Sequence, residues 1–159
     1  MADLLTHACV GLLVSRASDR VLWTGALAGS LLPDVFARVP PLALGRFVAP
    51  HVDLPPHLAL MFMPLHLPVG MVLSSAALAL LFVPRQRAAM FWSLLLGMGL
   101  HIAVDLLQDH LDVGYALLFP CSLVDFELPL MGSEDSIFAL PVLFPLTVFV
   151  FWRLRKPTR

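Results

Sequence analysis

Apolar segments long enough to cross a lipid bilayer dominate this chain. Two of them, residues 57–83 and 88–108, each reach the roughly 20 residues that a spanning helix needs. Over the whole chain of 159 residues, 59% are hydrophobic and only 13% are charged, against about 25% charged residues in an ordinary soluble domain. A soluble protein of this size could not cover its surface with so few charges. The sequence therefore predicts an integral membrane protein.

We expect an all-α fold, a polytopic membrane bundle of about five hydrophobic helices that forms a single domain over residues 1–159. The helices are predicted at about 4–18, 21–36, 57–83, 88–108 and 137–152. The first two are short for a bilayer, so they are expected to be tilted or packed inside the others. A proline-rich outer loop is predicted over 37–56 and a polar one over 109–136.

The basic residues predict how the bundle is oriented. Lysine and arginine favour the cytoplasmic side, and eight of the ten lie at the end of the first, third or fifth predicted helix or after it. Ten of the eleven carboxylates and all six histidines map to the opposite side or to the outward half of a helix. The positive-inside rule does not require the carboxylates and histidines to gather on one side. We therefore expect a multi-pass protein of a bacterial or archaeal cytoplasmic membrane, with a polar site facing the periplasm or the exterior.

The stretch HIAVDLLQDH, residues 101–110, follows one of the most apolar runs of the chain. His101 and Asp105 are one helical turn apart and share a face. An ionisable residue at membrane depth usually faces the bundle interior with a partner, and this pair can ligate a divalent cation. The alternative is a hydrogen-bonded pair that only joins two helices. His110 is about half a turn out of phase, and it joins the site only if the helix ends near Gln108.

Three further candidates lie towards the same outer side. His7, in THACVG, falls near the outer end of the first predicted helix, and Asp34, in GSLLPD, ends the second. His66 stands between two prolines in MPLHLP, and prolines break or kink a helix. Gly25 and Gly29 form a small-residue pattern that predicts close helix contact. That contact would bring Asp34 near its neighbours.

The second outer loop holds four carboxylates within eleven residues. Among them, Glu134 is a candidate metal ligand or general base. The alternative is a solvated loop in which Ser133 or Asp135 caps the last helix. The sequence contains no GxSxG elbow and no basic stripe, so neither a serine hydrolase nor a nucleic-acid partner is predicted.

With these residues identified, the motifs THxxxG, GSLLPD, a mid-chain histidine, HxxxD and LLFPxS resemble the YdjM-like family of LexA-binding, inner-membrane-associated metal-dependent hydrolases. The resemblance covers the chain from Thr6 to about Ile137. It implies a fold distantly similar to zinc-dependent phospholipase C and P1-type nucleases. It also implies metal ligands at His7, Asp34, His66, His101 and Asp105.

Two departures from the family pattern bear on the ligand set. Many relatives carry a second aspartate where this chain has Phe36, and the family segment around His66 is reduced to PLHLPVG. Either Glu134, Asp135 or His110 then supplies replacement ligands, or the site holds fewer metals, or activity is lost.

These observations predict a membrane-bound metal-dependent hydrolase. Imidazole and carboxylate ligands favour zinc, which lowers the pKa of a bound water so that hydroxide can attack a phosphoester or lipid-like ester. The predicted metal ligands are His7, Asp34, His66, His101, Asp105 and His110. Glu134 and His66 are the candidates for catalysis, and the expected partners are the lipid bilayer and a lipid or phosphoester substrate. The alternative is a non-catalytic membrane protein whose cluster is structural or binds a metal for sensing or transport.

Overall fold

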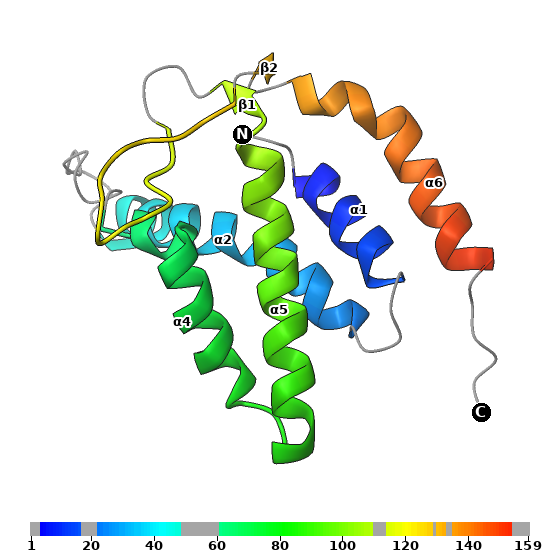
Figure 1. Ribbon diagram of the computed structural model, residues 1–159, viewed down its shortest axis with the longest axis horizontal. Helices are drawn as coiled ribbons and strands as arrows, with labels where there is room; N and C mark the ends of the chain where they lie inside the picture. Colours follow the sequence, from blue (N-terminus) through cyan, green and yellow to red (C-terminus); the bar gives the residue numbers. More distant parts are fainter. Residues whose placement is uncertain are drawn as a thin grey trace.

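The computed structural model describes residues 4–16, 22–48, 61–109, 114–128, 130–132 and 135–153. Within these ranges the fold is mostly helical, with almost no strand (Figure 1), so the all-α prediction is confirmed. The described α-helices are α1 Leu4–Ser15, α2 Trp23–Ala43, α4 Pro68–Ala79, α5 Pro84–Asp105 and α6 Leu140–Arg153.

Shorter elements connect the helices. A π-helical turn, Leu44–Val48, continues from α2, and the 3₁₀ turns Met63–His66 and Asp135–Ala139 precede α4 and α6. Beyond α5, the strand β1 (Gln108–Asp109) pairs in parallel with β2 (Met131–Gly132). These two strands lie above the end of α5, at the top of Figure 1. The chain after α5 therefore folds back over the end of that helix.

Two predicted boundaries are wrong. A loop was expected from residue 37, but α2 continues through Pro40 and Pro41 to Ala43. The proposed single helix over 57–83 is interrupted at Leu67, whose φ of −95° and ψ of 159° are extended. The residue before a proline is driven out of the helical region, and the proline that follows suits the first position of α4. Two differences are smaller: α1 ends at Ser15, and α5 ends at Asp105, before the predicted residue 108.

The helices α2 and α5 cross in close contact because glycines face the crossing. A Cβ atom on Gly97 would collide with the carbonyl oxygen of Ala26 and would lie 2.8 Å from the amide nitrogen of Ser30. A Cβ atom on Gly29 would collide with the carbonyl of Leu94. Close packing of the small-residue face of α2 is thus confirmed. The contact holds one turn of α2 directly against the second half of α5.

The apolar core lies between α4, α5 and the segment after α5. Its buried residues are Leu67, Met71, Met98, Ile102 and Tyr115. On the other side of α5, α6 packs along α1, as Figure 1 shows. The guanidinium of Arg16 lies 3.9 Å from the ring centroid of Phe151, which joins the carboxyl ends of α1 and α6.

Two helical segments of the described chain, Trp23–Phe47 and Pro84–Asp105, are long and apolar enough to cross a membrane. The remaining apolar helices, Leu4–Ser15, Pro68–Ala79 and Ile137–Arg153, are shorter. Only two of the five predicted spans are therefore supported by length and composition. Helices of this kind also occur in the cores of soluble proteins.

Candidate metal centre

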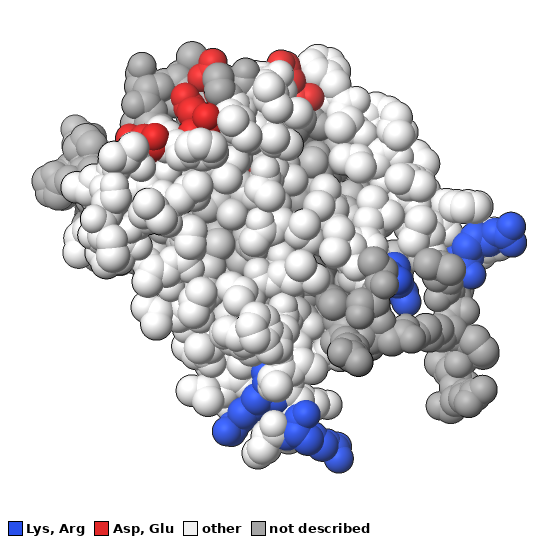
Figure 2. Space-filling view, in the orientation of Figure 1, with Lys and Arg blue, Asp and Glu red and all other residues white. Residues whose placement is uncertain are grey.

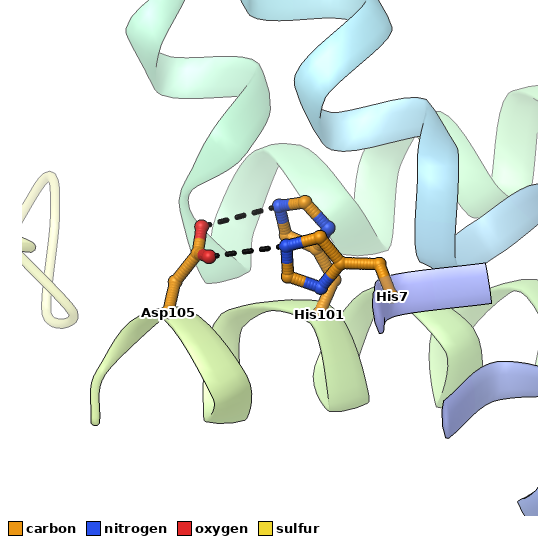
Figure 3. A group of neighbouring side chains, drawn as sticks. All are labelled: His7, His101 and Asp105. Atoms are coloured by element: carbon orange, nitrogen blue, oxygen red, sulfur yellow. Dashed lines mark ion pairs between the residues drawn. The ribbon is translucent and has the colours of Figure 1, made fainter. Parts of the chain in front are cut away.

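Four buried side chains converge on one point inside the bundle. They are His7 from α1, His66 from the 3₁₀ turn before α4, and His101 and Asp105 from the carboxyl-terminal part of α5. None is more than 2% exposed. Figure 3 shows the rings of His7 and His101 both turned towards the carboxylate of Asp105. The Nε2 atom of His7 lies 3.2 Å from Oδ1 of Asp105. The Nε2 atoms of His66 and His101 lie 3.2 and 3.3 Å from Oδ2.

A main-chain hydrogen bond sets the tautomer of His101. Its Nδ1 atom lies 2.8 Å from the carbonyl oxygen of Ser30 on α2. A carbonyl oxygen only accepts, so Nδ1 carries the proton and donates it. In the neutral ring, Nε2 then keeps its lone pair, which faces the centre. Histidines that bind metals are held in this way by a partner on their other nitrogen.

His7 and Asp105 approach each other without forming a hydrogen bond. The ring of His7 stacks on that of His101, with centroids 3.9 Å apart and an angle of 25° between the planes. Among the described residues, the two ring nitrogens of His7 have no hydrogen-bond partner. The same is true of Oδ1 of Asp105. Buried polar atoms are nearly always paired. Two buried atoms at ion-pair distance, 3.2 Å apart, with no hydrogen bond between them are what a shared cation would explain.

Asp34 lies beside this group. It is 3% exposed, and neither oxygen of its carboxylate makes a hydrogen bond within the described residues. The Nε atom of Arg38, one turn further along α2, is 3.5 Å from Oδ1 of Asp34. The partner is partly in solvent, so this ion pair compensates the buried carboxylate only weakly.

Two overlapping groups of buried residues could hold a metal ion: His7, His101 and Asp105 form one, and Asp34, His66 and His101 form the other. Within each group the potential ligand atoms all lie within 4.8 Å of one another. His101 belongs to both, and its Nδ1 is occupied by Ser30. Only Nε2 remains for an ion, so His101 can serve a single ion. We therefore treat the two groups as one centre.

The helix end adds a favourable field. Asp105 is the last residue of α5 and His101 lies one turn before it. The carboxyl end of a helix carries a partial negative charge that favours cations. Imidazole and carboxylate ligands are those that zinc takes in proteins, and catalytic zinc sites use three such ligands with a fourth position for water.

The other sequence candidates do not add to the centre. His110 and Glu134, predicted as a ligand and as a general base, lie outside the described residues. Asp135 is exposed, and its carboxylate accepts a hydrogen bond from the amide of Gly132. Phe36, at the position where the family resemblance would place a second aspartate, packs against the apolar core.

Sequence reasoning missed Tyr115. Its hydroxyl donates a hydrogen bond of 2.9 Å to Oδ2 of Asp105, and its ring stacks on His66 with centroids 5.5 Å apart. Burial, reinforced by the charge of Asp105, raises the pKa of Tyr115 well above its usual range, so the hydroxyl remains a donor. The available signal was that Tyr115 is the only tyrosine in the chain and stands ten residues after Asp105.

No protein-family model, curated protein or solved structure matches this chain. The resemblance to the YdjM-like family therefore stays a prediction from its motifs. What the geometry itself establishes is a buried histidine and aspartate cluster that could bind a metal ion.

Proposed function

We propose that the protein is a membrane-bound, metal-dependent hydrolase with a zinc centre at His7, His101 and Asp105. In this proposal Asp34 and His66 complete the polar pocket around the ion. The observation that carries the proposal is the pair of buried atoms His7 Nε2 and Asp105 Oδ1, which face each other at 3.2 Å with no hydrogen bond.

Part of this cluster lacks hydrogen bonds within the described part of the chain. The Nε2 atoms of His66 and His101 lie 3.1 Å apart. Because His101 donates through Nδ1, the only proton between these two nitrogens in the neutral rings is one on His66. That proton can serve His101 or Asp105 Oδ2, whereas Asp105 Oδ1 and the ring of His7 make no hydrogen bond among the described residues. Leaving such groups buried and unsatisfied costs about 1–3 kcal/mol each, and a cation bound through their lone pairs would offset that cost.

The chain's own residues would divide the chemical work. A bound divalent ion supplies a hydroxide at neutral pH by lowering the pKa of water. His7, His101 and Asp105 would hold the ion, and the hydrogen bond from His101 to Ser30 would keep the ring directed towards it. His66 lies beside both Asp105 and Asp34, so it can accept a proton and pass it on. Glu134 stays the sequence-based candidate for a general base.

The distribution of charge supports a membrane location. In Figure 2 the acidic side chains gather at the end of the molecule near β1 and β2, and the basic ones lie at the α4–α5 turn and beside the end of α6. Large apolar side chains are exposed between these ends, among them Leu73, Trp92 and Phe149. Extended exposed apolar surface marks contact with lipid or protein. By the positive-inside rule, the end carrying the candidate metal centre would face the periplasm of an inner membrane.

An apolar cavity supports a lipid-like substrate. It has a volume of ≈ 520 Å³ and is lined by residues of α2, α5, the end of α4 and the α4–α5 turn, including Ala28, Leu78, Phe82 and Leu94. Ligand pockets typically measure about 300–1,000 Å³. Leu94 lies two helical turns before His101 on the same face of α5, about 10 Å along the axis. A phosphoester that carries an acyl chain would place its head at the centre and its chain in this cavity.

Metal content of the detergent-purified protein tests the centre. The wild type is expected to hold stoichiometric zinc, whereas His101→Ala and Asp105→Ala lose it while keeping their helical circular dichroism. Asp125→Asn, which changes an exposed carboxylate away from the cluster, should keep its zinc. A wild type that takes up no metal when supplied with zinc would contradict the proposal.

Activity of the zinc-loaded protein tests the reaction. Hydrolysis of a phosphatidate in mixed micelles is expected for the wild type and for Asp125→Asn, and should be absent from the two metal-free variants. Bound zinc without hydrolysis of phosphomonoesters or phosphodiesters would instead support a non-catalytic protein that uses the ion for sensing or transport.

A further inference from the structure

We infer that Tyr115 is a positioning residue that makes Asp105 a one-oxygen ligand of the metal ion. The inference rests on the proposed metal centre and deepens it. Its starting point is that the two oxygens of Asp105 have different surroundings. Oδ2 accepts the hydroxyl of Tyr115 at 2.9 Å, and the Nε2 atoms of His66 and His101 lie 3.2 and 3.3 Å from it. Oδ1 faces His7 Nε2 at 3.2 Å and has no hydrogen bond among the described residues.

The hydroxyl of Tyr115 is held in place by contacts that do not involve the ion. The amide of Tyr115 donates to the carbonyl of Phe126 at 3.1 Å, and the amide of Phe126 donates back at 3.0 Å. This antiparallel bridge holds the backbone, while the ring lies in the apolar core and stacks on His66. With backbone and ring both held, the hydrogen bond to Asp105 costs little further conformational entropy.

The arrangement selects how Asp105 can coordinate. A carboxylate can bind an ion through one oxygen or through both. With Oδ2 engaged by Tyr115, Oδ1 keeps its lone pairs for an ion on the side of His7, whose ring stacks on that of His101. One-oxygen coordination keeps the number of protein ligands low and leaves a position for water, as catalytic zinc sites require. Residues that form hydrogen bonds to metal ligands typically contribute 10–100-fold to metal affinity or activity.

Replacing the hydroxyl alone tests this role. Tyr115→Phe keeps the ring and its stacking on His66 but removes the donor to Asp105. Zinc affinity, measured by competition with a chelating dye, is expected to fall about 10–100-fold. In the Co²⁺-substituted protein, the visible absorption should weaken and shift, because Asp105 becomes free to bind through both oxygens and raise the coordination number.

Ser75→Ala is the matched control. The hydroxyl of Ser75 is also fully buried and also makes a hydrogen bond, at 3.3 Å to the sulfur of Met98, but it does not touch Asp105. This variant should therefore keep the zinc affinity and the Co²⁺ spectrum of the wild type. A purely structural role for Tyr115 would lower the thermal stability of Tyr115→Phe and leave both metal readouts unchanged, which would overturn the inference while the hydrolase proposal stands.

A second measurement does not depend on a variant that folds. Tyr115 is the only tyrosine, so incorporation of 3-fluorotyrosine places one ¹⁹F probe at this position in an otherwise native chain. Saturation with Zn²⁺ is expected to shift its resonance in the wild type and not in His101→Ala. A wild type that binds zinc stoichiometrically with no ¹⁹F shift contradicts the role of Tyr115, whereas a wild type that binds no zinc contradicts the metal centre itself.

Discussion

The Nδ1 atom of His101 donates a hydrogen bond of 2.8 Å to the carbonyl oxygen of Ser30, and so links the metal centre to the spacing between α2 and α5. That spacing depends on glycine at the crossing, because the backbones touch at Gly29 and Gly97. A change that separates the two helices should therefore act on the ion as well as on the fold.

Gly97→Ala tests this link. The added Cβ would collide with the carbonyl of Ala26, and overpacking of this kind costs about 1–3 kcal/mol. We expect a lower midpoint of thermal unfolding together with a reduced zinc content. Gly99→Ala on the same helix is the control, since nothing lies within 4 Å of its added Cβ. In a helix interior that exchange should stabilise by about 0.5–1 kcal/mol with zinc content unchanged. Equal zinc content in both variants would contradict the link.

Orientation in the membrane can be read from a native thiol. Cys121 is free and exposed in the segment that follows Tyr115, and Cys9 is buried. A membrane-impermeant maleimide is expected to label the wild type in intact cells and not Cys121→Ser. When Gln86→Cys is added to Cys121→Ser, it places a thiol at the α4–α5 turn without altering charge, and labelling should then require permeabilised cells. The reverse pattern would mean that the metal centre faces the cytoplasm.

Filling the apolar cavity should impair recognition of the substrate's acyl chain without affecting metal binding. Ala28→Trp places a large ring in the cavity wall. Excluding two methylene groups of a substrate chain, at about 0.8 kcal/mol each, corresponds to roughly a tenfold loss. We expect kcat/KM for a long-chain phosphatidate to fall by about that factor, with the dibutyryl analogue and zinc content unaffected. Ala76→Trp, on the exposed face of α4, should change none of the three. Equal losses for both substrates would argue against an acyl chain in this cavity.

Helical periodicity and motif spacing were enough to predict several residues of the candidate metal centre. The one-turn separation of His101 and Asp105 placed both on one face of a helix, and the structure has them so. The proline-flanked His66 and the helix-borne His7 join them at about 3.2 Å. These residues could be predicted from the sequence because they are polar side chains within apolar segments. Burying an isolated polar group is costly, so a shared site is favourable.

The parts that the sequence did not predict depend on tertiary contacts. Ser30 contributes its main-chain carbonyl, which no sequence pattern can reveal. It accepts the hydrogen bond from His101 only because α2 and α5 cross at this point. Tyr115 reaches Asp105 because the chain after α5 returns along Phe126, and short loop pairings have no periodic pattern. The sequence also did not predict that α2 continues through Pro40 and Pro41, because prolines usually break a helix. Here they fall in the last turn of a long helix that is already formed.

All the described side chains that surround Asp105 belong to segments between His7 and Tyr115, and α6 packs instead on α1. A nascent chain that has emerged through Phe126 therefore already carries the residues of this pocket and the bridge that holds Tyr115. The pocket can therefore assemble before the last helix is synthesised, and α6 is added afterwards against α1.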